Sequence, residues 1–339
     1  MKYTFPLAAV IALVLIAWIG SQIPGMQYFF GIAVPYLAMA LFLGGFCYRV
    51  VHWARSPVPF KIPTTCGQGF SLPWIKYDRL EAPVKTSEVV ARMFLEITVF
   101  RSLWRNTKAE VYSGPKLTYE SSKWLWLFAL MFHYSFLVIV LRHMRLFLEP
   151  VPGWVSFLGA SDGFLQIGAP PIYITDLTIV LGLLLLFGRR LINRQVRYIS
   201  LANDMFPLFL IFGIVITGIL MRMFLRTDID IVAIKRLAVG LVTFQPAIIT
   251  DIGAIFYVHV FLVSVLLAYF PFSKLMHMGG VFLSPTRNMA NDTRMRRHIN
   301  PWNPDIKPHS YDAYEDEFRE DMVSMGIPVE KELPPKADD

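Results

Sequence analysis

The chain has 339 residues, of which 55% are hydrophobic and only 17% are charged, with a net charge of +7. Soluble domains carry about 25% charged residues, so this composition excludes an ordinary soluble domain and indicates a membrane protein. The basic excess does not require a nucleic-acid partner, because positive residues gather beside membrane spans. The two cysteines, Cys47 and Cys66, form no CxxC pattern, which excludes an iron–sulfur cluster or a covalently attached haem.

A helix needs about 20 mostly apolar residues to cross the hydrocarbon core. Six segments qualify and predict an all-α membrane protein of about six transmembrane helices, with a four-helix core and two N-terminal helices. The segments are about 4–21, 30–51, 124–147, 172–188, 206–225 and 252–273. The first segment leaves a retained helix and a signal peptide as alternatives. Its long apolar run and the poor cleavage site SQIPG favour the retained helix.

Charge bias predicts the orientation of these helices. Segment 54–123 holds eleven Lys/Arg against six Asp/Glu, segment 189–197 is strongly basic, and segment 148–171 has no Lys or Arg. The positive-inside rule therefore places 54–123, 189–205 and both termini in the cytoplasm, and 148–171 outside. We expect four regions: helices in 1–53, a cytoplasmic loop in 54–123, the core in 124–278 and a cytoplasmic tail in 279–339.

Two parts outside the core are expected to contact other surfaces. Within the loop, Val90, Phe94 and Ile97 recur at helical spacing, with Arg92 and Arg101 expected elsewhere on the surface. This helix either lies at the membrane interface or packs beneath a partner subunit. The polar tail is interpreted as an arm that binds partner subunits, with disorder as the alternative.

Four histidines in two predicted spans carry the strongest functional signal. His133 and His143 lie in the third segment. His259 lies in the last segment, and His277 lies just after its end. Ionisable side chains inside a bilayer are costly and mark functional sites. The predicted topology makes the two spans antiparallel, so His133 pairs with His277 near the cytoplasm and His143 pairs with His259 near the outside. We predict that each pair binds the iron of one haem b, in preference to a structural role for all four.

The spacing within the two pairs differs. Ten residues separate His133 from His143, and eighteen separate His259 from His277. A continuous helix would give roughly 15 Å and 27 Å at about 1.5 Å per residue, and would put His259 and His277 on one face. We therefore expect helix tilt and a break near Pro271 to absorb the difference.

Four further residues are candidates for the outer site. Arg142 and Arg222 are suited to bind haem propionates, or they are ordinary helix-end residues. Tyr173 and Asp176 are candidates for a quinol site, with Tyr173 bonding a quinone carbonyl and Asp176 accepting a proton. The alternative is an ordinary helix start, in which Asp176 lies near the positive end of the helix dipole.

The H-x9-H and H-x17-H spacings over 124–278 resemble those of the gamma subunit family of respiratory nitrate reductase (NarI). PWIKYDRLEAPVK, PIYITD and INPWNP resemble the DsrM family, the cytochrome b of the sulfite-reduction-associated transmembrane complex. The resemblance implies two haem b groups, menaquinol oxidation, and electron transfer to a cytoplasmic iron–sulfur subunit resembling heterodisulfide reductase. It also implies other membrane and periplasmic subunits and a location in the cytoplasmic (inner) membrane.

Two other classes of protein are weighed against this hypothesis. A membrane anchor without redox activity would dock soluble subunits through 54–123 and the tail, and would be colourless. A proton or ion transporter would use the intramembrane histidines in a relay. The spans lack the further buried acids that such a relay needs, because Asp176 and Asp251 lie near span ends.

Overall fold

A computed structural model describes residues 2–56, 74, 76–112, 114, 116–165, 171–225, 230–247, 252–292, 305 and 307–331. The N-terminal part and the loop contain α1 (Thr4–Gly20), α2 (Met26–Tyr28), η1 (Phe29–Ala33), α3 (Val34–Ala54), α4 (Thr86–Val99), α5 (Arg101–Arg105), β1 (Thr107–Tyr112) and β2 (Lys116–Ser121). Three parts of the chain that the sequence analysis used lie outside the described residues. They are Cys66, the Pro- and Gly-rich stretch that precedes PWIKYDRLEAPVK and is predicted to be extended, and the INPWNP motif.

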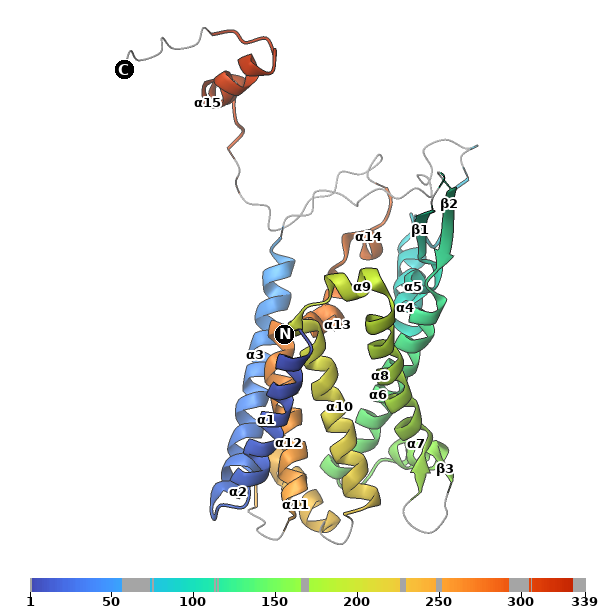
Figure 1. Cartoon of the computed structure of the whole chain (residues 1–339), viewed down its shortest axis with the longest axis vertical. Helices are drawn as coiled ribbons and strands as arrows, with labels where there is room; N and C mark the ends of the chain where they lie inside the picture. The colour runs from blue at the N-terminus through green and yellow to red at the C-terminus, as the bar shows by residue number, and fades with distance from the viewer. Residues whose placement is uncertain are drawn as a thin grey trace, which may run out of the picture.

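The remainder of the chain is also mostly helical (Figure 1). It contains α6 (Lys123–Phe147), α7 (Gly153–Asp162), β3 (Gly163–Leu165), β4 (Ile172–Tyr173), α8 (Ile174–Ile192), α9 (Arg194–Ile199), α10 (Ala202–Met223), α11 (Ile231–Val242) and α12 (Ala254–Tyr269). Short turns and helices follow as η3 (Phe270–Phe272), η4 (Lys274–Met276), α13 (His277–Gly280), η5 (Val281–Leu283), α14 (Pro285–Asn288) and α15 (Tyr311–Ser324).

Within the described part of the chain, four helices are long and apolar enough to cross a membrane. They are Met26–Ala54, Lys123–Phe147, Ala202–Met223 and Ala254–Phe272. The apolar α1 is shorter than these, and α8 carries Arg189 and Arg190 in its last turn. Each of the six predicted segments contains a helix, so the prediction of an all-α membrane protein is confirmed.

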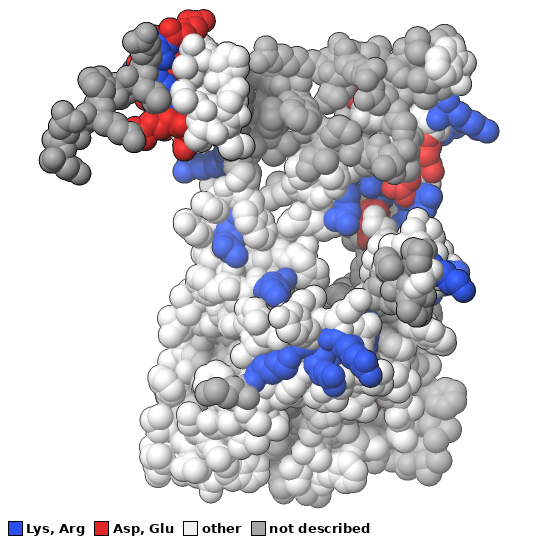
Figure 2. Space-filling model, turned by 45° about the horizontal axis from the view of Figure 1, so that its top comes forward, with Lys and Arg blue, Asp and Glu red and all other residues white. Residues whose placement is uncertain are grey.

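The connections gather at two ends of the helical bundle. Figure 1 places α9, α13, α14 and the β1–β2 hairpin at one end, and α2, α7 and α11 at the other. The lowest part of the surface in Figure 2 carries no charged side chains. The described elements of the basic loop 54–123 and the helix α9 of the basic segment 189–205 therefore share an end, as charge bias predicted, and the assignment of that end to the cytoplasm stays a prediction.

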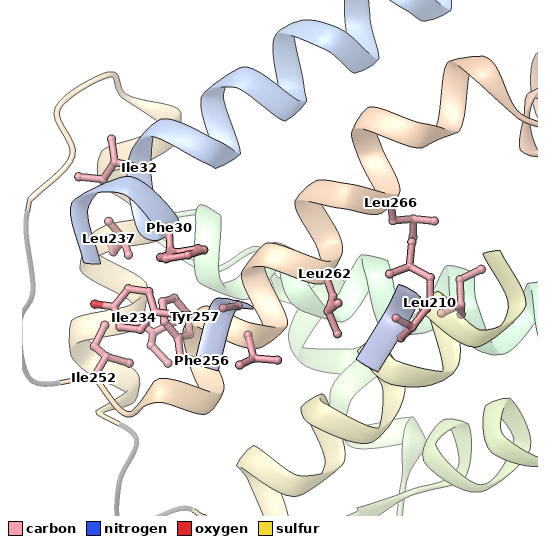
Figure 3. Packing of buried hydrophobic residues seen from close by; sticks show 14 of the residues in the cluster. Phe30, Ile32, Leu210, Ile234, Leu237, Ile252, Phe256, Tyr257, Leu262 and Leu266 are labelled. Carbon is pink, nitrogen blue, oxygen red and sulfur yellow. The ribbon is translucent and has the colours of Figure 1, made fainter. Parts of the chain in front are cut away.

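The hydrophobic core lies where the N-terminal helices meet α10, α11 and α12. Leu210 of α10 and Val258 and Leu262 of α12 are fully buried. Phe30 of η1 packs edge-on against Phe261, with ring centroids 5.4 Å apart. Figure 3 shows Phe30 beside Leu237 and Tyr257 in this cluster. Burial of these apolar side chains holds the two N-terminal helices against the core helices.

The helix α12 ends before it reaches His277. α12 stops at Tyr269, and two 3-10 turns, Phe270–Phe272 and Lys274–Met276, precede the short helix that begins at His277. Pro271 lies in the first turn, where it has no N–H to continue the helical ladder. The predicted break near Pro271 is confirmed. The expectation of one shared helix face for His259 and His277 is wrong, because no continuous helix joins them.

The loop helix α4 buries Arg92, which was expected on the surface, and leaves its apolar face exposed, as both predicted alternatives require. Arg92 and Glu96 are buried, at 4% and 6% exposure, whereas Val90 and Phe94 are exposed. Burial lowers the pKa of the Arg92 guanidinium, and the nearby Glu81 and Glu96 carboxylates act in the opposite direction. The polar face of α4 therefore packs inward through ion pairs, and its apolar face points away from the protein.

Several elements outside the predicted spans were not predicted from the sequence, among them the β1–β2 hairpin and the helices α7, α11 and α15. The β1–β2 hairpin pairs Thr107 with Ser121 and Tyr112 with Lys116, so the loop is not purely helical. The acidic helix α15 begins at Ser310, whose hydroxyl accepts from the Ala313 N–H at 3.2 Å. Its periodicity escapes an apolar-pattern search because most of its side chains are polar and exposed.

Gly182 allows α8 to approach the backbone of α6. An added Cβ would lie 3.2 Å from the Phe132 backbone nitrogen and 3.3 Å from its Cα, whereas Gly188 has open space. We expect Gly182→Val to lower the stability by about 1–3 kcal/mol through overpacking. Thermal unfolding in detergent measures this, with Gly188→Val as the control on the same helix. Equal melting temperatures for the two variants would contradict the close packing.

Candidate functional site

The structure brings His133 and His277 together. Their ring centroids lie 6.0 Å apart, and the ring planes are nearly perpendicular at 83°. Phe132 and Phe100 pack edge-on against the His133 ring at 5.0 and 5.1 Å. Phe100 reaches this position because it adopts a left-handed conformation (φ 51°) that ends α4. The loop helices therefore supply an apolar wall to the inner histidine pair, the pair near the α13 end.

Three of the four histidines use Nδ1 in the same way. The Nδ1 atoms of His133, His143 and His277 lie 2.7, 2.7 and 2.8 Å from the carbonyl oxygens of Ala129, Ile139 and Lys274. A carbonyl oxygen only accepts hydrogen bonds, so each Nδ1 must carry the proton. In the neutral imidazole, Nε2 then has its lone pair available for a metal or a donor.

His259 reaches the same protonation state through a side chain. The Thr217 hydroxyl lies 2.9 Å from His259 Nδ1 and donates to the carbonyl oxygens of Gly213 and Ile214. Because its proton is used on the backbone, the hydroxyl oxygen accepts from Nδ1–H. Gly218 makes room for the ring, since an added Cβ would lie 3.3 Å from His259 Cε1.

The outer pair, His143 and His259, is also brought together. The two rings lie close enough to interact electrostatically, and Arg142, Arg145 and Arg222 all act on His143. This surrounding positive charge favours an anionic group near the outer pair.

A network of charged residues surrounds Tyr173 at this end of the bundle. The buried Arg142 pairs with the buried Asp162 at 3.1 Å, and its guanidinium lies 3.6 Å from the centre of the Tyr173 ring. Asp162 also accepts from the Thr175 hydroxyl at 2.6 Å and from the Thr175 N–H at 3.0 Å. The Nε and Nη1 atoms of Arg142 are buried and have no hydrogen-bond partner among the described residues, so the guanidinium has donors available to a further acceptor.

Arg222 and Asp176 complete this network. Arg222 forms an ion pair with Asp176, donates to the Pro171 carbonyl at 2.7 Å and lies 4.3 Å from the centre of the Tyr173 ring. Asp176 also accepts from the Tyr173 N–H at 3.3 Å, which is the helix-start interaction given as the alternative. All four candidate residues of the outer site therefore lie together, and the roles in haem and quinol binding stay predictions.

The residues fit haem better than a bare metal ion. Two metal–imidazole bonds of about 2.0–2.1 Å, the length typical of zinc, would separate the nitrogens by about 4 Å and the ring centres by about 6 Å. The inner pair has a separation of 6.0 Å. No group of three or more His, Cys, Asp or Glu side chains gathers around a metal position in the described residues. Each pair therefore offers two imidazole nitrogens that would hold the iron of a haem, whose porphyrin would supply its other ligands.

Two functional residues were missed from the sequence. Asp162 lies in a predicted outer loop. It is the single acid between residues 150 and 171, and this could have indicated it as the partner of Arg142. Thr217 was a lone hydroxyl in an apolar span, and nothing local indicated that it would face His259. His52 is exposed and stacks on Tyr48, with ring centroids 5.9 Å apart.

The fold and these residues define a multi-pass helical membrane protein with two intramembrane histidine pairs. Residues 89–297 match the family described as nitrate reductase gamma subunit, and the chain belongs to this family. The match extends beyond the predicted core of 124–278, to α4 and into the tail. The resemblance to the nitrate reductase gamma subunit family is confirmed, and the narrower resemblance to the DsrM family stays a prediction.

Two relatives are similar over most of their length. The chain is 48% identical over 282 residues to the Hdr-like menaquinol oxidoreductase cytochrome b-like subunit of Archaeoglobus fulgidus, covering 81% of this chain and 83% of the relative. It is 42% identical over 279 residues to the subunit of the same name in Archaeoglobus profundus, covering 80% and 82%.

We predict that Asp162→Ala lowers the stability markedly. Removing one partner of a buried ion pair leaves an uncompensated charge and typically costs about 3–5 kcal/mol. Glu149→Ala is the control, because Glu149 is 66% exposed in its ion pair with Lys235 and such pairs contribute about 0–1 kcal/mol. Thermal unfolding of both variants measures the difference. A melting temperature for Asp162→Ala equal to that of the control would contradict a compensating role.

Proposed function

We propose that the chain is a dihaem cytochrome b that serves as the quinol-oxidising membrane subunit of an oxidoreductase complex. His133 and His277 would hold the iron of the inner haem, and His143 and His259 that of the outer haem. The observation that carries this proposal is the shared state of the four rings. Each has Nδ1 bonded and Nε2 without a described hydrogen-bond partner, which is the usual arrangement of metal-ligating histidines.

The haems would supply one-electron transfer, and the protein would position and insulate them. The bonds to Ala129, Ile139, Lys274 and Thr217 fix the ring orientations and hold the imidazole proton on Nδ1. Arg142 and Arg222 are proposed to bind the propionates of the outer haem, and the free Nε–H of Arg142 supports this role. Phe100 and Phe132 cover the His133 ring with apolar side chains.

Menaquinol is the proposed electron donor, as the names of both relatives suggest. We place its site near Tyr173 and Asp176, beside the outer histidine pair. Asp176 is held in an ion pair with Arg222, so it stays ionised until that pair opens. A proton released from quinol would then have an acceptor close to the outer surface, and the Tyr173 hydroxyl would bond a quinone carbonyl.

Electrons would pass inward to a cytoplasmic iron–sulfur subunit resembling heterodisulfide reductase. The "Hdr-like" names of the relatives support such a partner. We propose that the loop 54–123 and the tail 279–339 bind it, that both termini are cytoplasmic, and that the complex serves sulfite or sulfate respiration in the cytoplasmic membrane. Other membrane and periplasmic subunits are proposed on the same resemblance to the DsrM family.

The pairing of the haem ligands can be tested by counting haems. We expect about two haem b per chain in the wild type. His133→Ala and His277→Ala should each lose one and the same haem, because a bis-histidine site fails when either ligand is removed. His143→Ala and His259→Ala should each lose the other. Pyridine haemochrome absorbance and optical redox titration measure the content and identity of each haem.

His52→Ala is the matched control, since His52 is exposed at the end of α3 and far from both pairs in sequence. Loss of haems in crossed combinations, such as His133 with His259, would contradict the pairing. A colourless wild-type protein would instead favour the membrane anchor without redox activity.

The quinol site can be tested by the rate of haem reduction. We expect Tyr173→Phe to slow reduction by a soluble menaquinol analogue about tenfold, because one hydrogen bond contributes about 0.5–1.5 kcal/mol. The haem content should not change. Tyr134→Phe is the control, as its hydroxyl donates to the Thr98 carbonyl at 2.7 Å, near the loop helix. Stopped-flow absorbance measures both rates, and an unchanged rate for Tyr173→Phe would exclude Tyr173 from the site.

A further inference from the structure

A cavity of about 600 Å³ lies beside the inner histidine pair. Its walls come from three parts of the chain: Arg49 and Trp53 on α3, Asn203 on α10, and the segment after the α12 break, which includes Lys274 and His277. The cavity therefore joins a proposed haem ligand to a helix that lies outside the family-matched region 89–297.

The packing of α3 directs Arg49 toward this cavity. An added Cβ on Gly45 would lie 2.7 Å from Pro271 Cβ, so α3 is in close contact with the turn that ends α12. Residues four apart lie on the same face of a helix, which places Arg49 one turn further along this contact. The Arg49 guanidinium lies over the Trp53 ring, 5.3 Å from its centre, and this contact restricts the side chain before any ligand binds.

The two cations of the cavity differ in their partners. The Lys274 amino group forms an ion pair with Asp204 at 2.6 Å. No described carboxylate lies within ion-pair distance of Arg49, and its buried Nε has no hydrogen-bond partner among the described residues. A guanidinium that lines a cavity and has no carboxylate partner can offer its N–H donors to an anion. The cavity therefore offers a site for an anionic oxygen ligand.

We propose that Arg49 binds a propionate carboxylate of the inner haem, an inference that rests on the proposed function. His277 and Arg49 line one cavity, so an iron held by the imidazole and a carboxylate held by the guanidinium belong to one ligand. A guanidinium matches a carboxylate with two parallel hydrogen bonds. The helix α3 thereby supplies a haem-binding residue that the family region alone lacks.

An optical redox titration of the purified, haem-loaded full chain tests this proposal. We expect Arg49→Gln to lower the midpoint potential of the inner haem, because a nearby cation stabilises the reduced form, which carries one more electron. A tenfold change in the reduction equilibrium corresponds to about 59 mV for one electron, and we expect a shift of that order. The inner haem is the one that His277→Ala removes, and the outer haem should keep its potential.

Arg55→Gln is the matched control, because it removes the same charge from the exposed end of the same helix. It should leave both potentials unchanged, and Arg49→Lys should retain most of the wild-type potential. Arg49→Met keeps the apolar stem over Trp53 and replaces the Gln variant if that variant does not fold.

Unchanged potentials in the Arg49→Gln or Arg49→Met protein, or equal shifts in the Arg55→Gln control, would overturn the proposal. In both cases the wild type would still show two haems. That result separates this failure from failure of the proposed function, in which the wild-type protein itself would bind none.

Discussion

The hydrogen bond at each histidine Nδ1 is the interaction on which the proposed site depends. In a bilayer, polar groups must find partners within the protein, and an unsatisfied imidazole would be expensive. Backbone carbonyls and the Thr217 hydroxyl fill this requirement while they fix the tautomer. The same bonds that make the histidines tolerable inside the membrane leave Nε2 as the free atom of each ring. Stability and ligand geometry therefore have one physical cause.

The two ends of the bundle handle charge differently. Near the outer pair, Arg142 and Arg222 are each matched by an aspartate, and the Tyr173 ring lies beside both guanidiniums. Near the inner pair, Lys274 is matched by Asp204, whereas Arg49 has no described carboxylate. A buried network in which every charge has a partner is rigid, and a site with an unpaired cation attracts an anion. The outer end thus holds Arg142 and Arg222 in fixed positions around Tyr173, and the inner end presents Arg49 without a described carboxylate.

Long-range patterns were predictable from the sequence, and local polar partnerships were not. Six apolar runs predicted the helices, and the direction of the chain through the membrane predicted which histidines are partners. Both predictions depend on periodicity and charge summed over many residues. Asp162, Thr217 and the buried Arg92 were missed or misplaced, since each depends on a single contact between distant segments. The burial of the polar face of α4 was missed for a related reason. A helix that packs through ion pairs against its own loop turns its apolar side outward, and hydrophobic periodicity does not reveal which side is covered.

The break after Tyr269 explains how unequal spacings can serve two equivalent sites. From His259 to the end of α12 at Tyr269 is ten residues, the same number as from His133 to His143. At about 1.5 Å per residue both helical stretches advance by roughly 15 Å. The segment from Phe270 to Met276 then folds into two 3-10 turns with an extended Ser273 between them. These turns bring His277 close to His133 without adding a further long stretch along the helix axis. Pro271 is therefore part of the site, because it ends the helix at the depth that the antiparallel partner requires.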